Sequence, residues 1–131
     1  MIYLDTHVVV WLYAGRADLL PPAARALVDA NDLLFSPIVA LELQYLHETG
    51  RTTEAASPVL QALAREIGLH SCDLPFADVA DAALREAWTR DPFDRIVVAQ
   101  SRLRNSPLLT RDRDIHTHFD GAVWAGDEAE S

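Results

Sequence analysis

Short apolar runs alternate with helix-forming segments along the whole chain, and this alternation restricts the possible folds more than any other feature. Each apolar run is short enough to be a buried strand, and proline or capping residues begin several segments between them. We expect strands at residues 2–4, 33–35, 69–72, 108–110 and 121–124, and helices at residues 6–14, 21–30, 36–48, 54–67, 76–88 and 91–104. The pattern predicts an α/β domain with a mostly parallel central sheet and helices on both faces.

Two segments carry expectations about individual side chains. The stretch at residues 111–114, Arg-Asp-Arg-Asp, is expected to be a polar loop after the fourth strand. In the helix at residues 76–88, helical spacing predicts the core-facing side chains Val79, Ala80, Ala83, Leu84, Ala87 and Trp88. In α/β sheets, ligands bind at the carboxyl ends of the strands. Residues that follow the expected strands are therefore the first candidates for a functional site.

Chain length and cysteine content restrict the class of protein. A chain of 131 residues suits one hydrophobic core, so we expect a single domain over residues 1–126 and an acidic, frayed tail over residues 127–131. The single cysteine excludes a disulfide framework and a cysteine-rich zinc site. No apolar run reaches the roughly 18 residues of a membrane helix, and no signal-peptide pattern is present. We expect a cytoplasmic protein with no membrane partner.

Charge is unevenly distributed along the sequence. The net charge of −9 disfavours a nucleic-acid partner for the chain as a whole, because phosphates are bound by basic residues. Residues 85–113 nevertheless hold seven of the eleven arginines and only four acidic residues. A polyanion could therefore bind to this segment. The chain has no lysine, which excludes a P-loop nucleotide site and lysine Schiff-base chemistry.

Four acidic residues occupy positions where a strand ends or where burial is expected. Asp5 and Asp112 follow expected strands, whereas Glu42 and Asp94 have apolar neighbours at helical spacing. Each has a structural explanation: Asp5 as a helix cap, Asp94 in a capping box, Asp112 as a turn residue, and Glu42 as a partner of Arg95. Because unpaired buried carboxylates are costly, a shared divalent cation explains all four more simply.

A metal site of this kind has a defined chemistry. Mg²⁺ takes oxygen ligands and relieves the repulsion between clustered carboxylates, which otherwise raises their pKa values. It lowers the pKa of a bound water and neutralises charge on a phosphodiester oxygen during in-line attack. Such a site needs no serine or cysteine nucleophile, and the sequence has no evident one. The acids therefore make metal-dependent phosphodiester hydrolysis a candidate activity.

Four segments carry a family resemblance by order, spacing and context: Tyr3-Leu4-Asp5-Thr6-His7; Ser36-Pro37 followed by Leu41-Glu42-Leu43; Asp91-Pro92-Phe93-Asp94-Arg95; and Leu109-Thr110-Arg111-Asp112-Arg113-Asp114. On these segments, residues 1 to about 124 resemble the PIN-domain family and, within it, the VapC toxins of bacterial VapBC toxin–antitoxin modules. The resemblance implies a three-layer α/β/α fold and an Mg²⁺- or Mn²⁺-dependent endoribonuclease. It also implies a homodimer and inhibition by a small VapB-type antitoxin whose C-terminal segment enters the active-site groove.

The same resemblance implies roles for individual acids. Asp5, Glu42, Asp94 and Asp112 match the catalytic and metal-binding quartet of the family. Asp5 and Asp94 are expected to be the principal direct ligands. Glu42 would act through water or as general base, and Asp112 would complete a second site. Asp91 is expected to cap its helix rather than bind metal.

Residues beside the quartet receive supporting roles. Asp114 is an auxiliary ligand candidate, and Thr6 and Thr110 could hydrogen-bond the carboxylates. Three arginines are placed to contact RNA phosphates, with surface ion pairing as the alternative for each: Arg95, Arg111 and Arg113. The histidines are expected to be structural or interface residues at positions 7 and 47 and a solvated loop pair at positions 116 and 118. The three tryptophans are expected to make core or dimer contacts.

Other functions compete with the toxin ribonuclease. A PIN nuclease in RNA processing would share the site but would not arrest growth on expression. A catalytically inactive PIN-like binding module would lack metal-dependent cleavage, although all four quartet positions are acidic here. A receiver-like domain phosphorylated on aspartate also has acids at strand ends, but the absence of lysine disfavours it. For the toxin, an arginine or lysine of the antitoxin could occupy the carboxylate cluster and displace metal or substrate.

Overall fold

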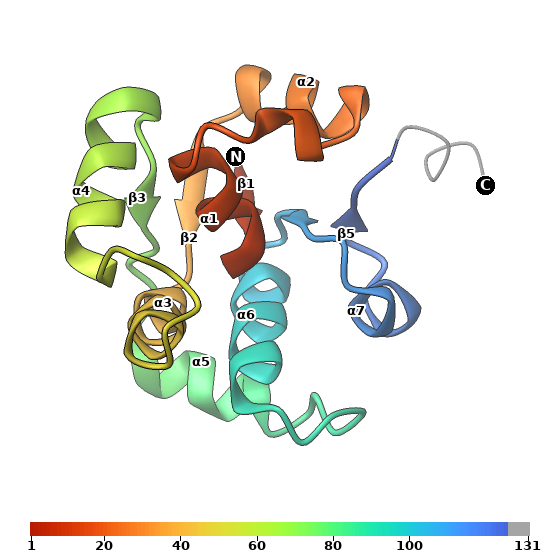
Figure 1. The fold of residues 1–131 in the computed structure, drawn as a ribbon. Coiled ribbons are helices and arrows are strands. Elements are labelled where there is room, and N and C mark those ends of the chain that lie inside the picture. Colours follow the sequence, from red (N-terminus) through yellow and green to blue (C-terminus); the bar gives the residue numbers. More distant parts are fainter. Residues whose placement is uncertain (126–131) are drawn as a thin grey trace.

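A five-stranded sheet forms the centre of the computed structural model, which describes residues 1–125. The strands are β1 (Ile2–Leu4), β2 (Leu33–Phe35), β3 (His70–Ser71), β4 (Leu108–Leu109) and β5 (Ala122–Val123). Their order is β3-β2-β1-β4-β5, and all four pairings are parallel (Figure 1). The expected parallel sheet is confirmed. The tail expected at residues 127–131 lies outside the described residues.

Helices pack on both faces of this sheet and complete a three-layer α/β/α fold. The α-helices are α1 (Thr6–Tyr13), α2 (Pro22–Ala30), α3 (Pro37–Glu48), α4 (Ala56–Ile67), α5 (Phe76–Ala83), α6 (Pro92–Leu103) and α7 (Arg113–His118), and a short 3-10 helix spans Ala17–Leu19. None of the helices in the described part of the chain is long and apolar enough to cross a bilayer.

The connection from β3 to β4 places the residues that follow β1 next to those that follow β4. The chain moves outward from β1 to β2 to β3 and then crosses back to place β4 on the other side of β1. The register pairs Leu4 of β1 with Leu109 of β4, so both strands end at the same level. The direction of the chain along the sheet therefore reverses between β1 and β4, which is where α/β sheets form their ligand crevices.

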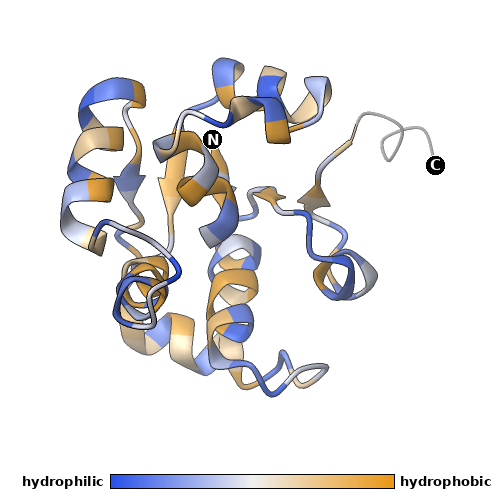
Figure 2. Cartoon of the chain, viewed as in Figure 1, coloured by the Kyte–Doolittle hydropathy of each residue, from blue (hydrophilic) through white to orange (hydrophobic). Residues whose placement is uncertain are grey.

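The core is built around the three middle strands. Every residue of β1, β2 and β4 is buried, whereas both residues of the edge strand β3 are exposed. Figure 2 shows the same contrast, with apolar residues in the central strands and hydrophilic residues in β3. Because these strands are buried, the point at which each one ends is fixed, and so is the position of the residues that follow it.

Acidic and small polar residues begin the helices next to the strand ends. Ser36 caps α3 by accepting a hydrogen bond from the Ile38 N–H (3.4 Å), and Pro37 takes the first helical position. Asp5, Asp91 and Asp112 cap α1, α6 and α7 in the same way. At the carboxyl end of α4, Gly68 adopts a φ of 72°, in the left-handed region that favours glycine.

The helix expected at residues 76–88 is shorter than the pattern indicates. The helix α5 ends at Ala83, and Leu84, expected in the core, is 71% exposed. Ala87 is also exposed and Trp88 is half-buried. Beyond the helix the chain turns so that the Glu86 carboxylate points inward, where it accepts hydrogen bonds from Arg102 and Trp88. An ion pair between buried Glu86 and exposed Arg102 therefore stands where helical spacing predicted apolar contacts.

The expectation of a polar loop over residues 111–114 is also wrong in part. The chain re-enters a helix at Arg113, because the Asp112 carboxylate accepts hydrogen bonds from the N–H groups of Asp114 (2.9 Å) and Ile115 (3.2 Å). Ile115 is fully buried and anchors this helix to the core. His116 and His118 consequently lie on α7 rather than in a solvated loop.

Candidate active site

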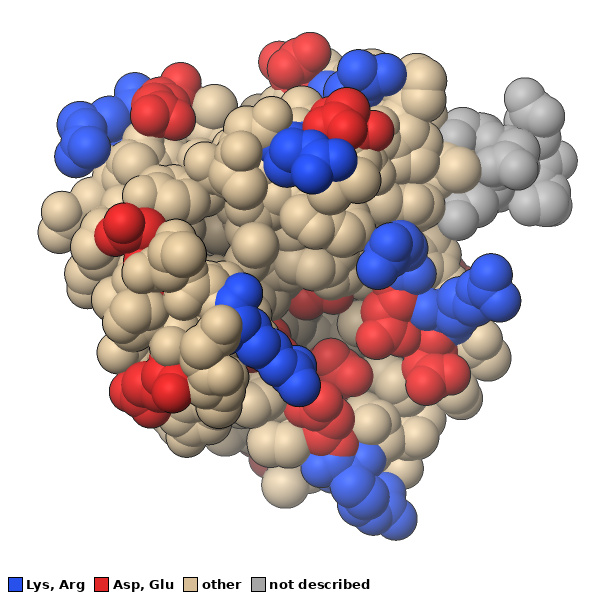
Figure 3. All heavy atoms as spheres, in the orientation of Figure 1, with Lys and Arg blue, Asp and Glu red and all other residues tan. Residues whose placement is uncertain are grey.

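An acidic cavity of about 370 Å³ opens at the carboxyl ends of β1 and β4. Figure 3 shows a hollow with acidic side chains inside it and basic side chains around its rim. All four acids of the predicted quartet line this cavity together with one further acid, so its acidic lining is Asp5, Glu42, Asp91, Asp94 and Asp112. They come from four separate helix starts or faces, which the topology brings to one place.

Asp5 is the most buried of these acids. It is 7% exposed and follows β1 directly. Its Oδ1 atom accepts a hydrogen bond from the Thr6 N–H (2.8 Å), and its Oδ2 atom accepts one from the Thr110 hydroxyl (2.6 Å). The role as helix cap and the place in the cavity are therefore compatible, because different carboxylate oxygens serve them.

Glu42 approaches the cavity from α3. Its carboxylate accepts a hydrogen bond from the Thr6 hydroxyl. Burial and the negative charges of Asp5 and Asp91 raise the pKa of Glu42, while the Thr6 hydrogen bond opposes this shift. The expected pairing with Arg95 does not occur, since the Arg95 Nε–H donates to the Thr89 carbonyl instead (2.8 Å).

Asp94 and Asp91 lie together at the start of α6. The Asp91 carboxylate accepts hydrogen bonds from the N–H groups of Phe93 (2.8 Å) and Asp94 (3.4 Å), so the expected cap is present, although Asp91 also lines the cavity. Burial raises the pKa of Asp94 to about 7, and the other four acids of the cavity add to this rise. The shift therefore has two causes, loss of contact with water first and repulsion by the neighbouring carboxylates second.

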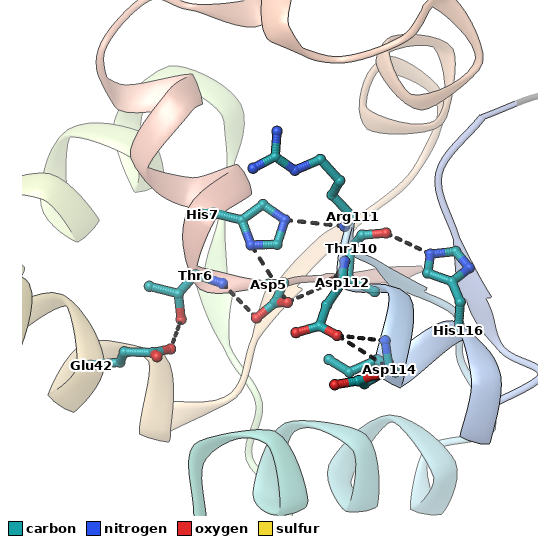
Figure 4. Close-up of polar contacts among 10 residues, drawn as sticks. Asp5, Thr6, His7, Glu42, Thr110, Arg111, Asp112, Asp114 and His116 are labelled. Carbon is teal, nitrogen blue, oxygen red and sulfur yellow. Dashed lines mark hydrogen bonds and ion pairs between the residues drawn. The ribbon is translucent and has the colours of Figure 1, made fainter. Parts of the chain in front are cut away.

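Thr110 connects the two strand ends through one hydroxyl group. It is fully buried, donates to Asp5, and accepts a hydrogen bond from the Asp112 N–H (3.1 Å). Figure 4 shows these contacts side by side with the Asp112 carboxylate above the start of α7. Asp114, by contrast, is exposed and does not line the cavity. Its expected role as an auxiliary ligand stays a prediction.

His7 lines the cavity, although its position in the sequence predicted only a structural or interface role. Its Nε2 atom accepts a hydrogen bond from the Arg111 N–H (3.1 Å), and its Nδ1 atom lies 3.7 Å from Oδ2 of Asp5. Burial lowers the pKa of His7, which suits a neutral ring that accepts at Nε2. Its position two residues after a strand-end aspartate was the available signal.

Arg51 and Thr52 also line the cavity, from the connection between α3 and α4. No motif marks this connection in the sequence, so only the fold reveals it. Of the predicted RNA-contact residues, Arg111 and Arg113 are exposed and line the next cavity along, with Trp124. Arg95 is half-buried beside Thr89.

The chemistry of the donor set fits a hard divalent cation. The acidic lining offers only carboxylate oxygens, which Mg²⁺ and Mn²⁺ prefer, and the raised pKa of Asp94 reflects repulsion that a cation would relieve. Within residues 1–125, no three His, Cys, Asp or Glu side chains are drawn together closely enough to coordinate one ion. The carboxylates thus surround the cavity without converging on one point.

Comparison with known proteins shows which family this chain belongs to. Ribonuclease VapC22 of Mycobacterium tuberculosis is 32% identical over 123 residues, which cover 89% of this chain and 91% of that protein. Two solved structures share the fold: VapBC2 from Rickettsia felis bound to a promoter DNA fragment (TM-score 0.65, 18% identity) and a toxin–antitoxin complex from Klebsiella pneumoniae (TM-score 0.68, 21% identity). Each likeness covers 94% of this chain and 96% of the other. The family model of the PIN domain matches residues 2–120, and this chain belongs to that family.

Proposed function

We propose that this protein is the toxin of a type II toxin–antitoxin module and acts as a divalent-metal-dependent endoribonuclease. The observation that carries the proposal is the cavity at the ends of β1 and β4, which five carboxylates line and where the pKa of Asp94 rises to about 7. The 32% identity to a VapC ribonuclease supports the reaction class. PIN nucleases generally depend on a divalent metal, and the carboxylate lining suits one.

In this proposal, Asp5 and Asp94 would be the principal ligands of Mg²⁺ or Mn²⁺, and Asp112 would complete a second site. A bound ion would supply Lewis-acid stabilisation of the phosphate and a more acidic water. Glu42 would act through water or as the general base that accepts a proton from the attacking water, a task that suits a carboxylate whose pKa is raised by burial. Asp114 remains an auxiliary candidate.

The two threonines keep the carboxylates oriented. The Thr6 hydroxyl donates a hydrogen bond to the Glu42 carboxylate, and the Thr110 hydroxyl donates one to the Asp5 carboxylate. Hydrogen bonds of this kind fix which oxygen of a carboxylate faces the cavity. RNA would enter over the rim, where Arg95, Arg111 and Arg113 are proposed to contact phosphates. Basic side chains around an acidic hollow suit a polyanion whose reacting phosphate must approach carboxylates (Figure 3).

A VapB-type antitoxin would use a groove beside the acidic cavity. This groove, of about 240 Å³, is lined by Val10, Tyr13, Leu43 and Val59 and shares Arg51 and Thr52 with the cavity. One extended segment could place apolar residues in the groove and an arginine or lysine among the carboxylates. Recovery of no small basic-tailed protein with the toxin from its native host would count against this partner.

A homodimer would cover the exposed apolar surface on α3 and α5. Leu41 and Tyr45 of α3 are 43% and 48% exposed, and Phe76 of α5 is 70% exposed. Leu84, directly after α5, is 71% exposed. Large apolar side chains exposed this far suit a subunit contact, and Leu41 and Phe76 line one groove. Phe76→Asp should therefore shift the sedimentation coefficient from dimer to monomer, whereas a monomeric wild type would contradict the dimer.

The proposed location is the cytoplasm, where RNA is available and the buried Cys72 thiol would stay reduced. Expression in a bacterial host, followed by sequencing of RNA ends, tests the toxin function. Growth arrest with discrete new RNA ends, both absent for Asp94→Asn, is the expected result. RNA cleavage without growth arrest would favour an RNA-processing nuclease, and neither effect would favour a binding module.

A further inference from the structure

Arg111 is fixed at its backbone by the first helix of the protein. Its N–H donates to Nε2 of His7, a contact between residues 104 positions apart in sequence. His7 in turn lies 3.7 Å from Oδ2 of Asp5. The place of Arg111 relative to the cavity is therefore set by the same helix turn that follows Asp5.

The side chain of Arg111 is also held in place, by an aromatic ring. Its guanidinium carbon lies 4.9 Å from the centre of the Trp11 ring, and Trp11 itself lines the acidic cavity. Figure 4 shows the Arg111 side chain extending from the end of β4 back over His7 toward α1. A guanidinium held over a ring face gives up little freedom when it binds a ligand, because the ring already restricts its position.

Trp11 is supported by its own neighbours. The His7 ring meets it edge-on at 5.1 Å, and Trp124 lies 6.0 Å from it. Trp124 also contacts His7, at 6.2 Å. The three rings form one cluster beneath Arg111, so the cation rests on a packed surface rather than on a single mobile side chain.

The guanidinium donors of Arg111 are unused within residues 1–125. Among the described residues, the Arg111 guanidinium makes no hydrogen bond and no ion pair. Two other arginines of the same region differ: Arg95 donates to the Thr89 carbonyl, and Arg102, which also lies over a ring, is paired with Glu86. Arg111 therefore combines a fixed position with free donors at the rim of the cavity.

We propose that Arg111 binds an RNA phosphate beside the catalytic carboxylates, and that His7 and Trp11 are positioning residues that act through it. His7 fixes the backbone of Arg111, and Trp11 fixes the plane of its guanidinium. The inference rests on the proposed ribonuclease function and deepens it, because it singles out one arginine and assigns roles to two residues outside the acidic quartet.

The test measures binding of a fluorescein-labelled single-stranded RNA oligonucleotide over a range of salt concentrations, in an Asp94→Asn background that prevents cleavage. Arg111→Ala should weaken binding about tenfold, as expected for a charge-assisted contact. It should also reduce the slope of log K against log salt by about 0.7, the value for one phosphate contact on a single strand. Arg65→Ala, an exposed arginine on α4, is the charge-matched control and should leave both values unchanged.

Trp11→Leu should weaken binding severalfold but keep the salt slope, because Arg111 retains its charge. Two variants at His7 separate positioning from packing. His7→Gln keeps an acceptor for the Arg111 N–H and should retain most of the affinity. His7→Phe keeps the ring contacts but has no acceptor, and it should weaken binding. A purely structural role would give the opposite order.

Three outcomes would overturn the inference. The first is an unchanged RNA affinity and salt slope in Arg111→Ala, and the second is wild-type RNA affinity in His7→Phe together with a loss of affinity in His7→Gln. The third is that Arg111→Ala loses antitoxin binding but not RNA binding. Failure of the ribonuclease proposal looks different. In that case, the protein with Asp94 intact would cleave no RNA in Mg²⁺ or Mn²⁺. If the protein with Asp94 intact cleaves RNA but Arg111→Ala binds RNA as well as its parent, only the role of Arg111 is contradicted.

Discussion

The Thr110 hydroxyl donates a 2.6 Å hydrogen bond to Oδ2 of Asp5, which joins the carboxyl end of β4 to that of β1. The same hydroxyl oxygen accepts a hydrogen bond from the Asp112 N–H. Because Thr110 is fully buried, no water can replace it in either contact. One side chain thus sets the relative positions of two acids that lie 107 residues apart in the sequence.

Thr110→Val should loosen the metal site while nearly preserving side-chain volume. It leaves Asp5 Oδ2 and the Asp112 N–H without their partner, so the free energy of unfolding should fall by about 1–3 kcal/mol. Mn²⁺ affinity, measured by calorimetric titration, should fall by about 10- to 100-fold, the usual effect of losing a group that orients a ligand. Thr110→Ser keeps the hydroxyl and should restore both values. Equal Mn²⁺ affinity in the valine and serine variants would contradict the role of Thr110.

Much of this arrangement could be predicted from the sequence. The apolar runs at β1 and β4 placed Asp5 and Asp112 at strand ends, and the spacing of Glu42 and Asp94 on their helices pointed both toward the core. These predictions rest on local periodicity, which the fold preserved. The hydrogen bond between Thr110 and Asp5 could not be predicted, because it depends on the register between β1 and β4.

Asp94→Asn should change the pH dependence of stability in the metal-free protein. The folded state raises the pKa of Asp94 from 3.8 to about 7, so it binds a proton more tightly than the unfolded state between these values. The free energy of unfolding should therefore fall as pH rises through this window in the wild type. At pH 8 the variant should be more stable by about 1–2 kcal/mol, since water partly screens a half-exposed group.

Thermal unfolding of metal-free protein at pH 4 and pH 8 checks this prediction. The two proteins should differ little at pH 4, where Asp94 is protonated in the folded state. Asp29→Asn, an exposed residue on α2, removes the same charge and serves as the control. A variant that is less stable than the wild type at pH 8 would contradict mutual repulsion in the cavity. Added Mn²⁺ should stabilise only the proteins that retain Asp94.

Thr6→Val should move the acid limb of the pH–rate profile. The Thr6 hydroxyl lowers the pKa of Glu42 against the opposing effects of burial and neighbouring acids. Without that hydrogen bond, the pKa of Glu42 should rise further, and the acid limb of kcat should shift to higher pH. Thr6→Ser retains the donor and should keep the wild-type profile. An unshifted acid limb in Thr6→Val would exclude Glu42 as the base.

Arg102→Leu should destabilise the turn that ends α5. Burial alone would raise the pKa of Glu86, but hydrogen bonds from Arg102 and Trp88 hold it below its ordinary value. The pair therefore adds stability above the unfolded pKa of 4.5, and this stability is lost as pH falls. At pH 7, loss of Arg102 should cost about 2 kcal/mol, less than for a fully buried pair. Adding Glu86→Gln should recover part of this in urea unfolding, whereas additive losses would show that the two side chains do not interact.

The parts of the site that could not be predicted come from contacts between distant elements. His7 looked like a helix residue with a structural role, yet it accepts the Arg111 N–H across the strand ends. Arg51 belongs to a connection with no motif and reaches the cavity only because α3 and α4 pack together. The error at residues 84–88 has a similar cause, since helical spacing cannot anticipate that a buried Glu86 will pair with Arg102.

Cleavage of total cellular RNA by the purified, antitoxin-free protein tests the central claim most directly. The reactions compare wild type, Asp94→Asn and the charge-matched Asp29→Asn, each with and without Mg²⁺ or Mn²⁺. We predict discrete fragments for wild type and Asp29→Asn only when metal is present, and none for Asp94→Asn. Fragments that persist in Asp94→Asn, or that form equally well with a chelator, would contradict a metal-dependent nuclease centred on these carboxylates.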